Sequence, residues 1–424
     1  MTSERVSPPP AAPTSRVRQA GRLAVAGLSV VLALTACSSG GGKAGGDGAK
    51  NGTAAGASPS ASPSPDKPKV TLSPADGASA VGPDSPVTVE ATDGTLSAVQ
   101  VRSANGGTVE GTVDASGKKW TSKGKLAFGA KYTVEVTMAG KTAEPVGSFS
   151  TAAIPAAADS VRVSSILGDN KTYGVGMPII LKLDHSLPDK AQRAAFEQAL
   201  TVKSTPATAG AWGWINSKEI HFRPTTFWAP NSTVHVGVDT AGRQLGSGKW
   251  GRTDITVDFK IGIKRELHAD SKTHHLQILE NGKQIKDLAV SLGSAKRPSS
   301  SGTMIVIDKR PKAMFDSSTY GLPVDAPGGY RTMVDYPMRL TWGGEFIHSA
   351  PWSVRQQGHT NTSHGCINVA PSDAVWLYNR VQVGDPVVVA NSGTPVKYGD
   401  GYMDWTLPFS QWLSHSAGGQ VSTA

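Results

Sequence analysis

The sequence of 424 residues predicts a mainly β protein, with two antiparallel β-sandwiches followed by a third β-rich domain that carries short helices. Short runs of alternating apolar and polar residues, such as 132–136, recur between glycine-containing turns, which is typical of antiparallel sandwiches. A weak internal repeat relates 70–152 to 158–262. In the third domain, Asn281-Gly282 joins two alternating runs, and this pair is the strongest short-range signal for a β-hairpin.

The second sandwich is expected to contain one helix, from Asp189 to Leu200, because Phe196 and Leu200 fall four positions apart on one face. Neither sandwich carries a cluster of catalytic side chains, so both are interpreted as spacer or docking domains. Three tryptophans of the second sandwich either stack on sugars or fill its core, and core packing is the commoner role. They are Trp212, Trp214 and Trp228.

The third domain is expected to hold strands such as 386–389 and a short helix from Asp373 to Arg380. Ser372 is predicted to cap this helix, with Val375 and Tyr378 on one face. The tail that follows is too apolar to remain in water, so we expect it to fold back on the third domain or on the preceding sandwich, with substrate stacking as the weaker alternative. Its large side chains are Met403, Trp405, Leu407, Phe409 and Trp412.

The N-terminus has the order of a secretory signal, because Arg16, Arg18 and Arg22 precede the apolar run 23–34, which is too short to span a bilayer. The run ends in Leu-Thr-Ala-Cys, which resembles a bacterial lipobox, so Cys37 is predicted to be acylated and to begin the mature protein. The protein is then exported and anchored by lipid to the outer face of the cytoplasmic membrane. A plain cleaved signal with release into the medium is the alternative.

These observations divide the chain into a signal, a tether and three domains with a tail. The tether is rich in Gly, Ala, Ser and Pro and cannot bury enough apolar surface to fold. The predicted order is a signal peptide at 1–36, a tether at 37–69, a first sandwich at 70–152, a second at 158–262, the third domain at 263–390 and the tail at 391–424.

The formal net charge of +9 falls to +6 in the mature chain, because residues 1–36 contribute four arginines and one glutamate, a net +3. This modest excess would favour an anionic surface such as a cell envelope. The basic residues are dispersed along the chain, so nucleic-acid binding is not expected.

The reactive group of the third domain is expected to be Cys366, one of only two cysteines. Because lipidation would consume Cys37, the Cys366 thiol has no disulfide partner, and an unpaired thiol in an exported protein indicates chemistry rather than a structural bridge. A base must activate such a thiol, and His348, His359 and His364 are the candidates. The alternative is a buried cysteine that acts as a small hydrophobe.

A cysteine that attacks a carbonyl carbon also needs donors for the oxyanion that develops. The backbone amides of His364, Gly365 and Cys366 come from a tight glycine-containing segment, a geometry that can direct several N–H groups at one oxygen. His348 ends the apolar strand predicted at 345–348, which would hold its imidazole rigidly.

His348, fourteen intervening residues and the run 363–368, Ser-His-Gly-Cys-Ile-Asn, resemble the signature of the bacterial L,D-transpeptidases, which carry a YkuD-type catalytic domain. The resemblance covers roughly 263–390. The segments 316–321 and 329–332 resemble the substrate-covering lid of the actinobacterial members. The aromatic tail at 401–405 and the presence of two preceding modules, which in that subgroup are immunoglobulin-like, resemble the same subgroup.

The resemblance implies an acyltransferase that needs no cofactor and no metal. Its substrates would be peptidoglycan stem peptides: the cysteine attacks the third residue of a donor tetrapeptide, releases D-alanine, and passes the acyl group to an acceptor amine, which makes a 3→3 cross-link. Carbapenems would acylate the same cysteine. Phe315 departs from the methionine expected in the lid of close relatives, and His359 matches no family role.

Residue roles follow from the same resemblance. Cys366 would be the nucleophile and His348 the general base, with the carbonyl of Ser349 orienting the imidazole. His364, Gly365 and Cys366 would supply the oxyanion contacts. The donor site would be lined by Tyr330, Gly343, Gly344 and Asn368, with Ser363 supporting the loop.

Three other interpretations compete with a transpeptidase. A zinc site formed by His348, His359, His364 and Cys366 has suitable ligand types, but two of these residues are only two apart in a glycine turn and no second cysteine is available. An L,D-carboxypeptidase would use the same groups, with water as the acceptor. A non-enzymatic wall-binding lipoprotein would rely on the two sandwiches and the positive charge.

Overall fold

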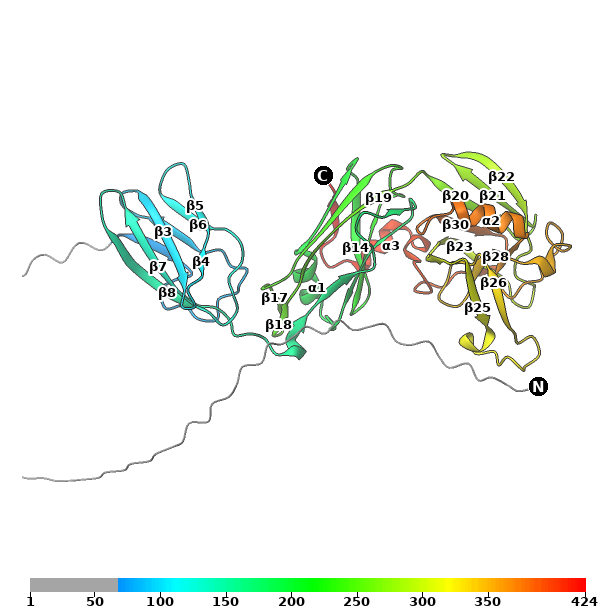
Figure 1. The fold of residues 1–424 in the computed structure, drawn as a ribbon, viewed down its shortest axis with the longest axis horizontal. Coiled ribbons are helices and arrows are strands. Elements are labelled where there is room, and N and C mark those ends of the chain that lie inside the picture. Colours follow the sequence, from blue (N-terminus) through cyan, green and yellow to red (C-terminus); the bar gives the residue numbers. More distant parts are fainter. Residues whose placement is uncertain (1–67) are drawn as a thin grey trace, which may run out of the picture. The chain divides into compact units, whose positions relative to one another are not determined.

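The computed structural model describes residues 68–424, and its fold is mainly β with a few short helices, as the sequence predicts (Figure 1). The signal, Cys37 and nearly all of the predicted tether lie outside the described residues. Over 68–424 the structure contains no helix with the length and apolar character needed to cross a membrane.

The first module is a sandwich of two four-stranded sheets. Apolar side chains from both sheets, among them Trp120 and Tyr132, form one core, in which Tyr132 stacks on Phe149 at 5.3 Å between ring centroids. One sheet has the order β1 (Val70–Ser73), β2 (Thr88–Ala91), β6 (Lys119–Ser122), β5 (Gly111–Val113), and the other β4 (Thr108–Val109), β3 (Leu96–Ser103), β7 (Lys131–Met138), β8 (Ala143–Ser150).

The second module is a larger sandwich whose first sheet includes a strand from the C-terminus of the chain. That sheet has the order β10 (Val163–Ser165), β12 (Ile179–Leu183), β15 (Glu219–Pro224), β14 (Ala209–Asn216), β32 (Gln420–Ser422). The second sheet has the order β11 (Thr172–Tyr173), β19 (Asp254–Ile261), β16 (Thr233–Asp239), β13 (Leu200–Thr205). A small sheet joins β17 (Gln244–Gly246), β18 (Lys249–Gly251) and β9 (Ser160–Val161), which follows the 3-10 helix η1 (Ala157–Asp159).

The predicted helix of the second module is shorter than expected. Helix α1 covers Lys190–Glu197, with Asp189 and Gln192 forming a capping box at its start. Leu200 begins strand β13, so only Phe196 of the predicted apolar pair packs from the helix into the core. The three tryptophans fill the core, each no more than 3% exposed, which excludes the sugar-stacking alternative for these side chains.

The third domain contains three sheets. The largest has the order β22 (Lys283–Ala289), β21 (His275–Glu280), β20 (Arg265–Asp270), β30 (Pro386–Ala390), β23 (Ser300–Ile305), β31 (Thr394–Pro395). The second has the order β24 (Asp308–Lys309), β27 (Met338–Arg339), β28 (Phe346–Ser349), β29 (Ile367–Val369). The third is a hairpin of β25 (Lys312–Asp316) and β26 (Arg331–Asp335), whose connection begins with the 3-10 helix η2 (Ser317–Tyr320) and which projects from the domain in Figure 1.

Two sequence predictions for the third domain have clear outcomes. The Asn281-Gly282 hairpin is confirmed, since both residues have positive φ, 50° and 80°, and join β21 to β22. The cap at Ser372 is wrong: helix α2 covers Pro371–Arg380 and Ala370 is its N-cap. Proline suits the first helical position because its fixed φ matches the helix and the N–H it lacks has no partner there.

The predicted face of α2 is also wrong. Ala374 and Leu377 are fully buried, whereas Val375 is 38% exposed. The largest sheet also extends past residue 390, because Thr394 and Pro395 pair with β23.

The tail returns to the second module. It forms η4 (Asp404–Thr406), α3 (Phe409–Trp412), η5 (Leu413–His415) and then β32, which pairs antiparallel with β14. Trp412 is fully buried and its indole N–H donates to the carbonyl of Ala211 at 3.0 Å. The Trp405 indole donates to Gly176 O at 2.8 Å. Trp412 and Met403 are therefore buried, with Met403 in the core of the third domain, whereas Trp405, Leu407 and Phe409 are half-buried.

A buried charged cluster joins the tail to β15. His221 Nδ1 lies 2.8 Å from an oxygen of Asp404, and its Nε2 lies 2.9 Å from an oxygen of Glu219. Arg223 donates to the backbone carbonyl of Asp404 at 2.8 Å, and its guanidinium lies over the ring of Trp405 at 4.7 Å. The two carboxylates raise the pKa of His221 to about 9, against the effect of burial, so the imidazole is positively charged at neutral pH.

Candidate active site

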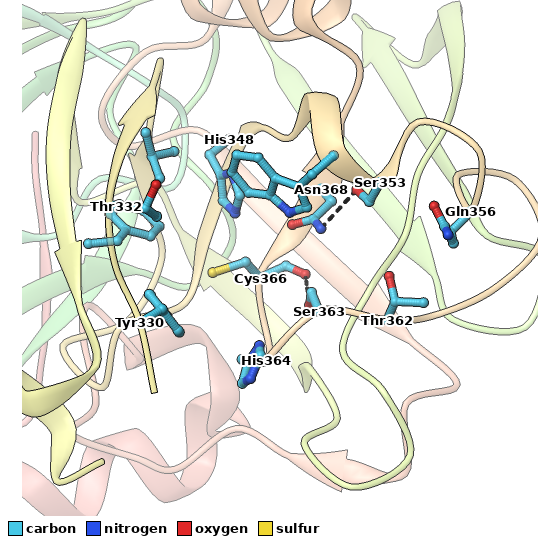
Figure 2. A pocket seen from close by; sticks show the side chains of 13 residues that line it. Tyr330, Thr332, His348, Ser353, Gln356, Thr362, Ser363, His364, Cys366 and Asn368 are labelled. Atoms are coloured by element: carbon cyan, nitrogen blue, oxygen red, sulfur yellow. Dashed lines mark hydrogen bonds between the residues drawn. The ribbon is translucent and has the colours of Figure 1, made fainter. Parts of the chain in front are cut away.

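Cys366 and His348 come together because their strands are neighbours. Strands β28 and β29 pair in parallel, with His348 in register with Asn368, two residues after the cysteine. Cys366 immediately precedes β29 and is 7% exposed. Figure 2 shows both side chains at the wall of one pocket, although they are eighteen positions apart in the sequence.

The imidazole of His348 has a defined tautomer. Its Nδ1 lies 2.9 Å from the backbone carbonyl of Ser349, which can only accept, so Nδ1 carries the hydrogen and Nε2 carries a free lone pair. This contact is the one expected from the sequence. Burial lowers the pKa of His348 to about 4, with the Ser349 carbonyl opposing the shift, so the ring is neutral at physiological pH.

The thiol of Cys366 is also neutral in this environment. Burial raises its pKa to about 12, only partly opposed by a hydrogen bond from the backbone N–H of Phe346, and the Glu345 carboxylate raises it further. The Sγ atom lies 3.7 Å from the carbonyl of Gly344, to which the thiol can donate weakly. The neutral imidazole, whose Nε2 is free, lines the same pocket as the neutral thiol, an arrangement in which it can accept the thiol proton.

The segment before the cysteine is held by its own serine. Ser363 Oγ accepts a hydrogen bond from the N–H of Gly365 at 3.1 Å and donates to the carbonyl of Cys366 at 2.6 Å. Gly365 has φ +123°, a conformation that favours glycine, and its carbonyl accepts from Ser299 Oγ at 2.6 Å. Since the Gly365 amide is engaged by Ser363, the amides of His364 and Cys366 remain as candidate oxyanion donors.

The pocket in front of the thiol has a volume of about 440 Å³. Aromatic side chains dominate its wall: Phe315 lies edge-on to His348 at 5.3 Å between ring centroids, and Tyr330 lies edge-on to His364 at 5.4 Å. Polar groups line the other side, where the Asn368 amide donates to Ser353 Oγ at 3.1 Å. Such a pocket suits an extended peptide with an apolar stem and a few hydrogen bonds.

The structure brings most of the predicted residues together. Tyr330, Ser363, His364 and Asn368 line the pocket with the thiol and the imidazole. Gly344 contacts the sulfur through its carbonyl, and Ser349 supports the imidazole from behind.

Two predicted candidates lie elsewhere. Gly343 is outside the pocket lining, and its N–H donates to Asp400 in the tail at 2.6 Å. His359 is exposed and also outside the lining. Over residues 68–424 there is no group of three or more His, Cys, Asp or Glu residues arranged to hold a metal ion, so the zinc interpretation has no geometric support there.

Sequence reasoning missed several wall residues. Val334 lines the pocket with Tyr330 and Thr332 of the predicted lid segment, and the alternation of strand β26 was the signal that could have found it. Trp352 and Ser353 belong to the 3-10 helix η3 (Pro351–Ser353), directly after the His348 strand. No local pattern marks the remaining missed wall residues, Gln356 and Thr362.

Comparison with protein families gives two matches. Residues 78–244 match a family described as a bacterial Ig domain, which agrees with the immunoglobulin-like interpretation of the modules. Residues 264–389 match the L,D-transpeptidase catalytic domain.

Individual relatives agree with these matches. L,D-transpeptidase 2 of Mycobacterium tuberculosis (strain CDC 1551 / Oshkosh) is 38% identical over 95% of this chain and 97% of its own length. L,D-transpeptidase 5 of M. tuberculosis (strain ATCC 25618 / H37Rv) is 30% identical over 83% of this chain and 78% of its own. A solved structure of L,D-transpeptidase 3 from M. tuberculosis with a faropenem-derived adduct is 32% identical, covers 54% of this chain and 97% of that one, and has a TM-score of 0.46.

Proposed function

This chain belongs to the L,D-transpeptidases, and we propose that it forms 3→3 cross-links in peptidoglycan by acyl transfer through Cys366. One observation carries the assignment of the nucleophile: the thiol and the free Nε2 of His348 line the same pocket, at the ends of two paired strands. The proposed donor is a stem tetrapeptide, and the acceptor is an amine on a second stem.

The first half-reaction forms a thioester. As Sγ attacks the carbonyl carbon of the third donor residue, His348 Nε2 takes the thiol proton, and the oxygen that becomes negative is stabilised by backbone amides of the turn, with His364 and Cys366 as donors. The C–N bond to the terminal D-alanine then breaks. The departing nitrogen receives the proton from His348, so D-alanine leaves as a neutral amine and the imidazole returns to its starting state.

The second half-reaction transfers the acyl group. The acceptor amine attacks the thioester carbon while His348 takes one of its protons, the C–S bond breaks, and the sulfur receives that proton. Burial lowers the His348 pKa, so the ring is unprotonated and Nε2 can accept a proton throughout the physiological range. The carbonyl of Ser349 supports this proton transfer by keeping Nε2 free.

Mass spectrometry of the products from a purified tetrapeptide stem tests this function. Cross-linked dimers together with free D-alanine are expected from the wild-type protein, and Cys366→Ala is expected to yield neither while remaining folded. Tripeptides without dimers would indicate an L,D-carboxypeptidase. Wild-type turnover by the alanine variant would overturn the role of the thiol and favour a wall-binding lipoprotein.

We propose that carbapenems acylate the same sulfur. A solved relative of this chain is in complex with imipenem. Attack on the β-lactam carbonyl opens the ring without a leaving group, so the intact mass should rise by the full mass of the drug. Wild-type protein should show one adduct and Cys366→Ala none; an adduct on the variant would exclude Cys366 as the sole target.

We also propose that the protein is exported and anchored by a lipid on Cys37. This proposal is supported by the order of segments at the N-terminus, where basic residues precede an apolar run that ends in Leu-Thr-Ala-Cys. Metabolic labelling with a fatty acid should mark the wild-type protein in the membrane fraction and leave Cys37→Ala unlabelled. Label on the variant, or an unlabelled wild-type protein in the medium, would contradict the anchor.

A further inference from the structure

A second cavity of about 550 Å³ lies on the other side of Phe315 from the thiol pocket, and its charge differs from that of the first. The residues that line the thiol pocket include no lysine, arginine, aspartate or glutamate. The second cavity is lined by three cations, Arg310, Lys312 and Arg339, and by one carboxylate, Asp308, which forms an ion pair with Arg310. Phe315 lines both, so the two cavities meet at this ring.

Arg339 differs from the other two cations in its surroundings. Arg310 pairs with Asp308 at 2.8 Å and Lys312 with Asp335 at 3.5 Å, and both side chains are more than two-thirds exposed. Arg339 is half-buried, and within residues 68–424 it has no carboxylate partner at ion-pair distance. Its side chain donates only to backbone carbonyls, those of Thr341 at 3.0 Å and Trp342 at 3.3 Å. A half-buried guanidinium that still has N–H groups available for hydrogen bonding is suited to an anionic ligand.

One aromatic ring connects this guanidinium to the reacting sulfur. The guanidinium lies 4.5 Å from the centroid of the Phe346 ring, and Phe346 packs in one buried cluster with Phe315 and Cys366. Phe346 and Phe315 lie 4.5 Å apart between centroids and form the wall between the cavities. An anion bound at Arg339 would therefore sit within a few side chains of the thioester.

The chemistry of acyl transfer identifies this anion. In the first half-reaction the departing nitrogen belongs to D-alanine, which carries a carboxylate on the adjacent carbon. In the second half-reaction the acceptor nitrogen must approach the same carbonyl carbon from the side that D-alanine has left. Both amines therefore use one locus, and a cation beside that locus can hold the carboxylate next to the departing amine, and also a carboxylate next to the attacking amine where the acceptor carries one.

We infer that the second cavity is the leaving-group and acceptor subsite, and that Arg339 binds the carboxylate adjacent to the amine that departs or attacks. This inference rests on the proposed transpeptidase function and specifies which end of each substrate the enzyme recognises. The acyl part of the donor, on the other side of the scissile bond, occupies the uncharged thiol pocket. Arg339 makes no bond to the reacting atoms, so its role is recognition of substrate.

The test uses two donors that differ only at the C-terminus, a tetrapeptide stem with a free carboxylate and its carboxamide. Wild-type protein should favour the carboxylate by about tenfold or more in kcat/KM, the range expected for a hydrogen bond to a charged group. Arg339→Gln should reduce this preference to about one. Arg339→Lys should restore part of it, because lysine keeps the charge without the planar fork.

Arg297 provides the matched control. It is also half-buried and has no ion pair within the described residues, but it lies beside His364 and outside the lining of the second cavity. Arg297→Gln should keep the preference for the carboxylate. Loss of the preference in this variant with retention in Arg339→Gln would overturn the inference, and so would equal kcat/KM for both donors in the wild type.

Two further readouts separate the possible failures. If wild-type protein makes no dimers from either donor, the proposed transpeptidase function is contradicted. If it makes dimers equally well from both donors, only the proposed carboxylate subsite at Arg339 is contradicted. Alkylation of Cys366 by iodoacetamide, which is uncharged, and the thermal midpoint report whether Arg339→Gln remains folded with a reachable thiol. If Arg339→Gln is folded, is alkylated normally and has lost the preference for the carboxylate donor, the subsite is supported. If Arg339→Gln is misfolded, Arg339→Lys decides: partial preference for the carboxylate in that variant supports the subsite, and no preference contradicts it.

Discussion

Two histidines of this chain are almost equally buried, yet at neutral pH one is uncharged and the other is positively charged. His348 on β28 is 4% exposed and His221 on β15 is 2% exposed. Burial lowers the pKa of His348 to about 4, because within residues 68–424 its only hydrogen-bond partner is a backbone carbonyl and its neighbours are the rings of Phe315 and Trp352. His221 lies between two carboxylates, which raise its pKa to about 9.

The difference shows that the partners of a buried imidazole, rather than its burial, decide its charge. A neutral ring with one free nitrogen is a base, and a charged ring with both nitrogens bonded to carboxylates is a fixed link between two segments of chain. The first arrangement suits proton transfer, and the second suits attachment of the tail to the second module. Three substitutions and a pH series test this contrast.

Substitution of the neutral histidine should have the largest effect, and it should fall on activity. We expect His348→Gln to lower kcat for dimer formation by roughly 10²- to 10⁴-fold, the range for loss of a general base, with little change in the thermal midpoint. Steady-state kinetics with the tetrapeptide stem and a melting curve measure both. Activity near wild type would mean that another group deprotonates the thiol.

Substitution at the charged histidine's partner should instead affect stability. Asp404→Asn removes a buried carboxylate and leaves the His221 charge half-compensated, which should lower the free energy of unfolding by about 3–5 kcal/mol. Asp258→Asn is the matched control, since it breaks an exposed pair with His235 whose side chains are 61% and 41% exposed. That pair should contribute less than about 1 kcal/mol. Equal destabilisation by the two variants in urea titrations would show that the buried cluster has no special role.

The sequence predicted a site role for His348 but gave no indication of the buried cluster around His221. The Ser-His-Gly-Cys motif and the spacing to His348 were sufficient to predict that the thiol and the imidazole share one pocket, because the parallel pairing of β28 and β29 brings these residues together. Nothing local marked His221, since its partner Asp404 lies 183 positions away and meets it only when the tail folds back. The same holds for β32 as a strand of the second module.

Smaller errors arose where side chains decide the outcome. The Ser372 cap failed because Pro371 already favours the first helical turn, and the Gly365 amide was assigned to an oxyanion although Ser363 occupies it. Arg339 was not singled out because its isolation from carboxylates is a tertiary property. Most strands and turns were thus predictable from the sequence, as was the Ser349 carbonyl as the partner of His348, whereas hydrogen bonds between residues far apart in the chain were not.

The pH dependence of stability should distinguish the two histidines by sign. A raised pKa in the folded state means that the contribution of His221, about 3 kcal/mol for a shift from 6.5 to about 9, is complete below pH 6.5 and is lost as the pH rises through about 9. The stability gap between wild type and Asp404→Asn should therefore shrink over that interval. A lowered pKa has the reverse effect, so His348 destabilises the fold as the pH falls from 6.5 toward 4.

Urea titrations from pH 4 to 10 measure both effects. Below pH 6.5 the free energy of unfolding of His348→Gln should rise relative to that of the wild type as the pH falls, because glutamine does not bind a proton. A gap for Asp404→Asn that stays constant from pH 6.5 to 9 would show that His221 is not charged in the folded protein. A constant difference for His348→Gln below pH 6.5 would show that burial does not depress its pKa.

The smallest effect should come from removing one of the apolar side chains that shield His348 from water. Trp352 is 58% exposed, and its ring lies 5.9 Å from that of His348, so Trp352→Ala should admit water without opening a core cavity. Hydration should raise the His348 pKa toward its ordinary value, and the acid limb of kcat/KM should move up by about one pH unit. Trp342→Ala is the control, since Trp342 is 51% exposed, packs against Tyr402 and lies outside the thiol pocket. Its acid limb should stay in place, and a shift of the same size in both variants would mean that the apolar cover does not set the His348 pKa.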